Sequence, residues 1–407
     1  MSLDEFLLSA DTTDLNYPEI RPTLDLNFAR TKTLDPRITF RRASGGSYFG
    51  PDGRLRLAGV NEARFTHDPV TGESLGLLVE EQRTNLLVRS EEFDNVANWV
   101  PGGGSVTANS IAAPTGATTA DTWTSTAGQI ASLYQQVACS ASTAYTFSFY
   151  VRLGTLPAAD FRIAVRDDSN AAFIAQDVVP NVTPVSTEWR RVIYTFTTPA
   201  GCTLVRPYLI RFGSTTGGTI HFWGAQLEAG AFPTSYIPTT TAAATRSADV
   251  ASITGAAFSS WYRQDEGTVF AEAISAVTPV GGAARRIFDI NNNSDSERLF
   301  VGQNTTSLIQ YFIQDDGSIQ ANLFTAAPAP SANNWIRTAA SYKTNDFTFL
   351  INGGAVNSDT LASVPSPTQM EIGARGTAAN ASLNSTIRRL TYWPQRLPNS
   401  TLQELTR

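Results

Sequence analysis

The stretch Tyr145-Thr-Phe-Ser-Phe-Tyr-Val-Arg152 alternates large apolar residues with polar ones. A period of two is typical of a β-strand that buries one face and exposes the other. Further short runs of this kind lie between clusters of Gly, Pro, Ser, Thr and Asn, at 161–166, 190–196, 204–211, 267–273, 285–290, 308–313 and 347–351. Long apolar faces with helical spacing are missing, so the sequence predicts an all-β protein of antiparallel sandwiches. We expect a single helix, at 398–407, capped by Asn399 or Ser400.

Three blocks follow from the spacing of these runs. Residues 1–90 are rich in charge and in turn sequences but poor in apolar residues, which predicts an irregular, extended β segment that packs along another chain. Residues 91–240 and 246–407 each hold a complete set of strands, which predicts two antiparallel jelly-roll β-sandwiches. The low-complexity run Pro238-Thr-Thr-Thr-Ala-Ala-Ala-Thr245 is expected to connect them.

Charge excludes several classes of protein. The 407 residues carry 30 Lys and Arg against 36 Asp and Glu, a net charge of −6, and all but two of the basic residues are arginine. An acidic chain without a basic run argues against nucleic-acid binding. No apolar run approaches the roughly 20 residues that span a bilayer, so we expect no membrane insertion. The acidic, briefly apolar start is not typical of a signal peptide, which predicts synthesis in the cytoplasm.

Motifs for catalysis are missing as well. The two histidines, His67 and His221, lie far apart and lack the spacing of a zinc site. The sequence contains no nucleophile elbow and no phosphate-binding glycine loop. The adjacent acidic pairs 80–81, 91–92 and 265–266 would point to opposite faces of a strand and so could not flank one glycosidic bond. We therefore predict no catalytic residues and no enzyme, although carboxylates distant in sequence could still converge.

Two longer runs resemble segments of tailed-bacteriophage virion proteins of the head-fibre, spike and tail-fibre type. The first is 61–87, NEARFTHDPVTGESLGLLVEEQRTNLL, and the second is 222–238, FWGAQLEAGAFPTSYIP, which closes a jelly roll similar to carbohydrate-binding modules. The end of the chain, 386–405, resembles a laminin-G or concanavalin-like sandwich. The resemblance covers the chain from about Leu24 onward, and only the two long runs are specific.

The resemblance implies a structural subunit of a tailed-phage virion: a fibre, spike or decoration protein on the head or tail. It implies a homotrimer whose first block docks on capsid or tail proteins, located in the virion. Two alternatives stay open. The protein is a host-glycan-binding adhesin, or, more distantly, a glycan depolymerase.

Trp99 and Trp123, and after them Tyr134 and Tyr150, are the candidates for sugar binding, because a jelly roll can present aromatic faces to pyranose rings. Trp99 precedes the flexible run Pro101-Gly-Gly-Gly104, which would leave its ring exposed. The alternative is that these rings fill the core. Trp189, Trp223, Trp335 and Trp393 lie in runs that define the sandwiches, and we interpret them as structural.

A calcium site is the one cofactor that the sequence suggests. Residues 291–297, Asn-Asn-Asn-Ser-Asp-Ser-Glu, cluster oxygen donors in a short loop, as calcium requires. Laminin-G-like domains often carry calcium at a loop rim, so the resemblance points to Asp295 and Glu297. The alternative is ordinary turn chemistry. Cys139 and Cys202 are too few for a disulfide framework, and the sequence leaves open whether they are bridged.

Overall fold

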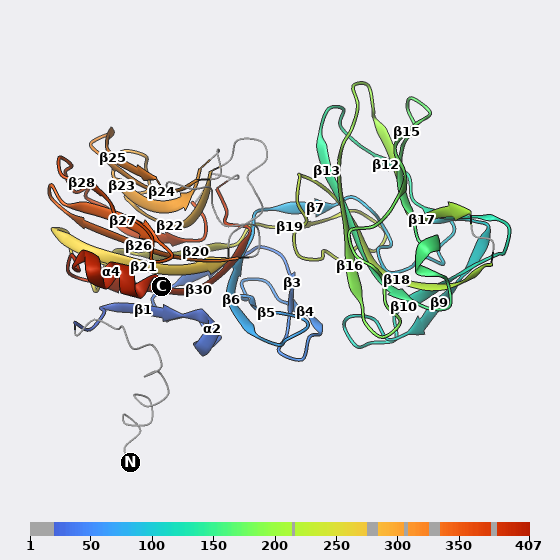
Figure 1. The fold of residues 1–407 in the computed structure, drawn as a ribbon, viewed down its shortest axis with the longest axis horizontal. Helices are drawn as coiled ribbons and strands as arrows, with labels where there is room; N and C mark the ends of the chain where they lie inside the picture. Colours follow the sequence, from blue (N-terminus) through green and yellow to red (C-terminus); the bar gives the residue numbers. More distant parts are fainter. Residues whose placement is uncertain (1–19, 214–215, 275–283, 305–307, 325–333, 376–380) are drawn as a thin grey trace, which may run out of the picture.

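The computed structural model describes residues 20–213, 216–274, 284–304, 308–324, 334–375 and 381–407. Nearly all regular structure in these residues is β-strand, and the α-helices α2 (Phe28–Thr31), α3 (Gly255–Ser259) and α4 (Asn399–Leu405) are short. The prediction of an all-β fold is confirmed. Two lobes lie side by side and are joined by a narrow middle region (Figure 1).

The jelly-roll lobe (residues 86–243) packs two antiparallel sheets face to face. A five-stranded sheet has the order β16-β13-β18-β10-β9, and a six-stranded sheet has the order β15-β14-β17-β11-β8 with β12 beside β17. The bounds are β8 Val100–Gly102, β9 Gly104–Ile111, β10 Ala120–Ser125, β11 Ile130–Tyr134, β12 Val137–Ala138, β13 Ala144–Leu153, β14 Ile163–Asp167, β15 Ala172–Val178, β16 Arg190–Thr197, β17 Leu204–Gly213 and β18 Gly218–Ala229.

Strand β13 shows how the alternating pattern builds this lobe. Phe147, Phe149 and Val151 are fully buried between the sheets, in one apolar cluster. Tyr150 and Arg152 alternate with them and therefore point to the outer face of the five-stranded sheet.

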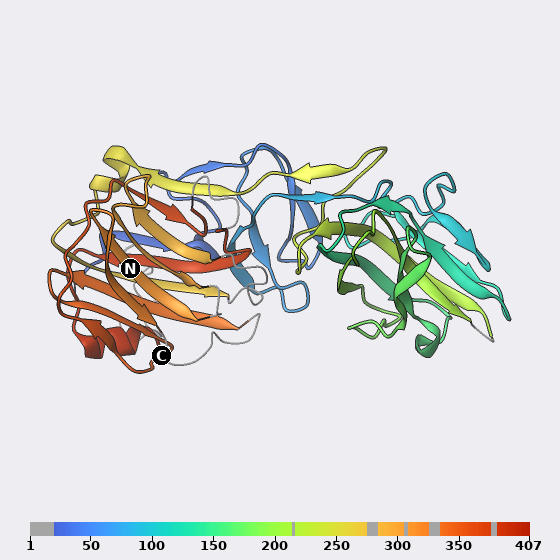
Figure 2. The ribbon, with the colours of Figure 1, turned by 90° about the horizontal axis from the view of Figure 1, so that it is seen from above.

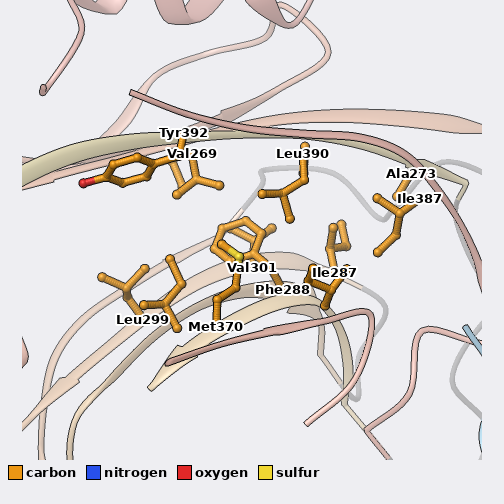
Figure 3. Close-up of a cluster of buried hydrophobic side chains, with 14 of the residues drawn as sticks. Val269, Ala273, Ile287, Phe288, Leu299, Val301, Met370, Ile387, Leu390 and Tyr392 are labelled. Atoms are coloured by element: carbon orange, nitrogen blue, oxygen red, sulfur yellow. The ribbon is translucent and has the colours of Figure 1, made fainter. Parts of the chain in front are cut away.

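The second lobe is a larger sandwich. Its first sheet has the order β28-β27-β26-β21-β30-β6-β5 with β1 also on β30, and its second has the order β2-β20-β29-β22-β23-β24-β25. Figure 3 shows the core between them, where Val269, Leu390 and Tyr392 face Phe288 and Leu299 across the gap. The bounds are β1 Leu24–Asn27, β2 Thr39–Arg41, β5 Phe65–His67, β6 Ser74–Val79, β20 Val250–Thr254, β21 Glu266–Ile274, β22 Arg285–Asn291, β23 Arg298–Gln303, β24 Ile309–Asp315, β25 Ser318–Phe324, β26 Trp335–Lys343, β27 Phe347–Ile351, β28 Asn357–Asp359, β29 Gln369–Ile372 and β30 Ser385–Trp393.

The described part of the first block belongs to this second lobe. β1 and β6 pair with successive parts of β30, and β2 pairs with β20. The sequence predicted that the block packs along another chain, whereas here it packs within its own, because its few apolar residues, such as Leu24 and Leu77, are buried in the sandwich core. We call residues 20–82 and 247–407 the split lobe, since the jelly-roll lobe is inserted between its two parts.

The two crossings between the lobes lie next to each other. β7 (Arg83–Asn85) leads into the jelly-roll lobe, β19 (Ala244–Arg246) leads out of it, and the two pair as an antiparallel ribbon. Figure 2 shows this ribbon bridging the lobes. The run 238–245, expected to be a plain connector, thus ends in a paired strand.

A buried ion cluster lies beside this ribbon. It consists of Arg42, Arg64, Glu80, Arg246 and Asp249, each 5% exposed or less. Arg42 and Arg64 both contact the Asp249 carboxylate, and Arg64 Nη1 lies 2.7 Å from Glu80 Oε2. Arg246 Nη1 lies 3.5 Å from the same Glu80 oxygen. Three guanidinium groups and two carboxylates, from both parts of the split lobe and from β19, thus lie paired away from water.

The jelly-roll lobe is attached to this cluster through its last segment. The Ser235 backbone N–H and hydroxyl donate to the Glu80 carboxylate at 2.7 and 2.6 Å. Phe232 lies between two guanidinium groups, with Arg83 and Arg285 each 4.6 Å from its ring centre. The runs 61–87 and 222–238, singled out by their resemblance, meet at this joint.

The two cysteines are close neighbours in the jelly-roll lobe. Their Sγ atoms lie 3.5 Å apart and both are free thiols. Burial, followed by the hydrogen bond with Cys139, raises the pKa of Cys202 to about 12, which keeps this thiol protonated at neutral pH.

Candidate functional site

A cleft of about 660 Å³ opens where the outer face of the five-stranded sheet meets the first block. One wall comes from strands β13 and β16 and the other from loops of the first block. Its lining residues are Phe49, Gly53, Arg54, Pro69, Val70, Ala112, Ala113, Pro114, Gly116, Tyr150, Arg152, Val182, Glu188, Trp189, Arg190 and Arg191.

The register of the strands sets the neighbours of Tyr150, which lines the cleft. Arg191 of β16 is opposite Tyr150 on one side of β13, and Trp223 of β18 is opposite Tyr150 on the other. Cross-strand neighbours on one face lie about 5 Å apart, so these three side chains form a continuous row. One step along, Arg152 is opposite His221.

Tyr150, which lines the cleft, is held by two buried aromatic rings outside the lining. Tyr150 packs against Trp223, with ring centres 5.6 Å apart, and Trp223 against Tyr236 at 4.7 Å. Burial raises the pKa of Tyr150 against the opposing charge of Arg191, so its hydroxyl stays neutral. Trp189 is half-buried at the entrance, and its Nε1 donates to the Ala112 carbonyl at 3.0 Å, which holds the ring in place.

Two of the arginines in the cleft have carboxylate partners and two do not. Arg190 contacts Glu188 at 2.5 Å, and Arg54 lies 4.0 Å from Asp52. Arg152 Nε donates to the Ser186 carbonyl at 2.7 Å, and Arg191 Nη2 donates to the Ser148 hydroxyl at 3.0 Å. Within the part of the chain that the structure describes, no ion pair is formed by Arg152 or Arg191.

The first block completes the cleft through a hairpin, β3 (Gly46–Phe49) and β4 (Leu55–Ala58). Leu55 is buried among Tyr150, Trp223 and Tyr236, and its backbone N–H donates to the Pro114 carbonyl at 3.0 Å. Phe49 packs against the same cluster. The cleft is therefore composite, and the isolated jelly-roll lobe would lack one of its walls.

The jelly-roll lobe resembles a known protein family in sequence. Residues 85–210 match a family described as a carbohydrate binding domain. The match covers about a third of the chain, all of it within or at the edge of the jelly-roll lobe, and includes Tyr150, Trp189 and Arg191. No curated protein matches the sequence.

Solved structures resemble about a third of the chain. The CBM40 module of the Ruminococcus gnavus IT-sialidase, bound to α2,6-sialyllactose, is 12% identical, covering 36% of this chain and 85% of that one (TM-score 0.29). The enzymatically active domain of bacteriophage CBA120 tailspike protein 4 is 17% identical, covering 36% and 21% (TM-score 0.29). The SAP-like pentraxin of Limulus polyphemus is 12% identical, covering 35% and 68% (TM-score 0.27). Such scores assign neither a ligand nor an activity.

Of the four aromatic candidates for sugar binding, Tyr150 lines the cleft, whereas the two tryptophans are in the core. Trp99 and Trp123 are both fully buried between the sheets of the jelly-roll lobe. Trp99 packs edge-on against Phe93, and its Nε1 donates to the Arg89 carbonyl at 2.9 Å. A ring enclosed on both faces has none to offer a sugar, so the prediction is wrong for these two residues.

Tyr134 is half-buried on the outer face of the six-stranded sheet, away from the cleft. Arg206 lies over its ring at 4.4 Å, and the Tyr208 ring centre is 4.8 Å away. Its exposed surface is thus shared with a guanidinium group. Trp189, which the sequence placed among the structural residues, is the half-buried ring that lines the cleft. A signal for it was the run Trp189-Arg-Arg191 at a strand entrance.

The calcium candidates do not face a common point. Asp295 contacts the guanidinium groups of Arg298 and Arg375, two positive charges that would oppose a cation. Glu297 accepts the backbone N–H groups of Asp316 and Ser366 at 2.8 and 2.7 Å. Among the described residues, His, Cys, Asp and Glu side chains form no group of three that could hold a metal. The expected calcium site is therefore not assembled from Asp295 and Glu297.

Two carboxylates distant in sequence do converge, in the split lobe. Asp289 of β22 is directly opposite Glu371 of β29, and the Asn291 amide donates to both at 3.1 and 3.0 Å. Burial raises the pKa of Asp289. The two residues are 0% and 6% exposed, so a polysaccharide chain has no access to them in this conformation.

The described residues contain no helix long and apolar enough to cross a bilayer.

Proposed function

We propose that the protein is a glycan-binding, adhesin-type protein that holds a sugar in the cleft between its lobes and does not act on it chemically. The observation that carries this proposal is the position of the cleft. It lies on the lobe whose sequence matches a carbohydrate binding domain, and Trp189, Tyr150 and Arg191 from the matched segment line it.

The chemistry of the cleft suits this role. The half-buried Trp189 ring offers an apolar face to the C–H groups of a pyranose. Guanidinium N–H groups of Arg152 and Arg191 can donate to hydroxyl or ring oxygens. Because these side chains are already held by hydrogen bonds to Ser186 and Ser148, little order has to be gained on binding.

The place of this binding protein in a larger assembly rests on the sequence resemblance. The two runs that resemble tailed-phage virion proteins form the joint between the lobes, which supports a shared architecture with those proteins. We propose a fibre, spike or decoration subunit of a virion, assembled as a homotrimer on capsid or tail proteins. Immunogold labelling of intact particles tests this, and a particle without label would refute it.

Glycan binding is tested with the full chain on a glycan array, followed by calorimetry on the strongest hit. We expect Trp189→Ala to weaken binding about tenfold or more, by analogy with nucleotide bases, whose stacking on one aromatic ring contributes on the order of 1–3 kcal/mol. The matched control is Trp335→Ala, another half-buried tryptophan, which lies under Arg388 in the split lobe. Equal binding by both variants, or no binding by the wild type, would contradict the proposal.

A further inference from the structure

The charge of the cleft is opposite to the charge of the protein. The chain carries a net charge of −6, yet four arginines and one glutamate line the cleft. Glu188 pairs with Arg190, and Asp52 lies near Arg54. Of the four arginines in the cleft, Arg152 and Arg191 form no ion pair with a carboxylate of the described residues. The wall formed by β13 and β16 is therefore cationic.

These two arginines are neighbours of Tyr150 in the strand register, and the guanidinium group of Arg191 lies over its ring. Arg152 follows Tyr150 by two residues on the same face of β13, and Arg191 is opposite Tyr150 on β16, with its guanidinium carbon 5.7 Å from the ring centre. Arg152 uses only its Nε on Ser186, and Arg191 uses only Nη2 on Ser148. The Nε of Arg191 is buried and has no hydrogen-bond partner in the described residues. Within the residues that the structure describes, both guanidinium groups therefore keep N–H donors without a hydrogen-bond partner.

His221, opposite Arg152 on β18, is affected by the positive charge of Arg152. Burial, and then the positive charge of Arg152, lower the pKa of His221, which donates or accepts at Thr122 with Nδ1 2.8 Å away. His221 is thus neutral at pH 7 and adds no further charge. A carboxylate placed near Arg152 would relieve this repulsion.

An unpaired charge in a half-buried site is unfavourable, and an oxyanion relieves it. Arg forms two parallel hydrogen bonds to a carboxylate or a sulfate, and such charge-assisted bonds are roughly twice as strong as those to a neutral hydroxyl. A neutral sugar would leave both guanidinium charges uncompensated. We infer that the cleft selects an acidic sugar, with the anionic group of a pyranose held between Arg152 and Arg191 and its ring against Trp189. This inference rests on the proposed glycan binding.

The test compares polyanionic and neutral glycans on the full chain by calorimetry. The probes are polygalacturonate for a carboxylate, dextran sulfate for a sulfate ester, neutral dextran, and polyglutamate as a polyanion without sugar. We expect at least tenfold tighter binding of one acidic glycan than of dextran or polyglutamate, and a loss of that preference at high salt. Which acidic glycan binds identifies the oxyanion.

Substitutions then test whether Arg152 and Arg191 bind the anionic group of the sugar. Arg152→Gln and Arg191→Gln should each weaken acidic-glycan binding at least fivefold. The matched control is Arg41→Gln, an exposed arginine on β2 of the split lobe, which removes the same charge far from the cleft and should bind as the wild type does. Unchanged thermal unfolding of each variant shows that the fold is intact.

The failures of the two proposals are distinguishable. Equal binding of dextran and the acidic glycans, weakened by Trp189→Ala but not by the arginine variants, would overturn the acidic-sugar inference and leave glycan binding in place. Equal binding of polyglutamate, or equal loss in Arg41→Gln, would also overturn it. Binding to none of the glycans would refute the proposed function itself.

Discussion

Each arginine of a neighbouring pair has its own surroundings, because adjacent residues on a strand point to opposite faces. Arg285 lies over Phe232 at the joint, while Arg286 lies over Phe300 at 3.6 Å. Arg42 is buried in the ion cluster, whereas Arg41 is exposed. One residue type thus neutralises carboxylates, covers aromatic rings and charges the cleft wall.

Glu80 is the residue for which the ion cluster makes a pH prediction. Burial opposes its ionisation, but the charges of Arg246 and Arg64 and hydrogen bonds from Ser235 outweigh burial and lower the pKa of Glu80 to about 2 from 4.5. A carboxyl pKa below its ordinary value stabilises the folded state above pH 4.5, and this stabilisation is lost as the pH falls toward 2. The shift corresponds to about 3 kcal/mol.

We therefore expect Glu80→Gln to destabilise the protein at pH 7 by several kcal/mol, on the order of the 3–5 kcal/mol for breaking a buried ion pair. The difference from wild type should shrink by about 3 kcal/mol between pH 6 and pH 2. Urea unfolding across this range measures it. Glu92→Gln, which breaks a partly exposed pair with Arg89, is the control and should cost less than about 1 kcal/mol. A pH-independent difference for Glu80→Gln would contradict the prediction.

The sequence pattern identified the aromatic and arginine residues of the strands as the important ones. It did not predict which of these side chains are buried and which line the cleft. Trp99 stands before a glycine-rich run yet is buried, while Trp189 lies inside a fold-defining run yet lines the cleft. The alternating pattern tells which residues share a face of a strand. It does not tell which face a distant segment such as the β3–β4 hairpin will cover.

Strands of the first block show the same limit at the level of elements. The chain pattern predicted strands but not their partners, because the register of a strand depends on residues far away in sequence. Leu24 pairs with Tyr392 and Leu77 with Ile387. From its few apolar residues, the sequence predicts that the first block does not fold alone. Only the strand pairing shows that it packs on the split lobe of its own chain.

Leu77 on β6 tests this placement of the first block. It is fully buried in the core of the split lobe, so Leu77→Ala should lower the free energy of unfolding by about 2–5 kcal/mol. Chemical denaturation followed by tryptophan fluorescence measures the change. The matched control is Leu57→Ala on β4, in the same block but 63% exposed, which should be nearly neutral. Equal stability of both variants would mean that the block does not belong to this core.

The lobes are held together in part by the β3–β4 hairpin, whose Leu55 and Phe49 pack against the cluster around Tyr150. The ribbon of β7 and β19, the bonds from Ser235 to Glu80, and the Phe232 ring between Arg83 and Arg285 join the lobes. The cleft draws its walls from both sides of this joint. Its shape therefore depends on the lobes keeping one relative position.

Phe232 is the residue whose loss should uncouple the lobes. Phe232→Ala removes a buried ring and two cation–π contacts, which we expect to cost about 3 kcal/mol. In calorimetry the lobes should then unfold in transitions further apart, and glycan binding in the cleft should weaken. The control is Phe173→Ala, a ring under Arg166 and Arg211 on the far sheet of the jelly-roll lobe. An unfolding profile for Phe232→Ala no broader than that of the control would contradict the prediction.

The central place of β30 has a consequence for biosynthesis. One edge of this strand pairs with β21, and the other pairs with β6 and β1. These three strands therefore lack this hydrogen-bonded neighbour until β30 has been synthesised. Strand β30 also lies about 300 residues after β6 in the chain. At roughly 5–20 residues per second, β1 and β6 are without this partner for tens of seconds, while the inserted jelly-roll lobe is already complete. Nascent chains would therefore mature from the middle outward, and their earliest strands would be the ones most in need of protection from aggregation.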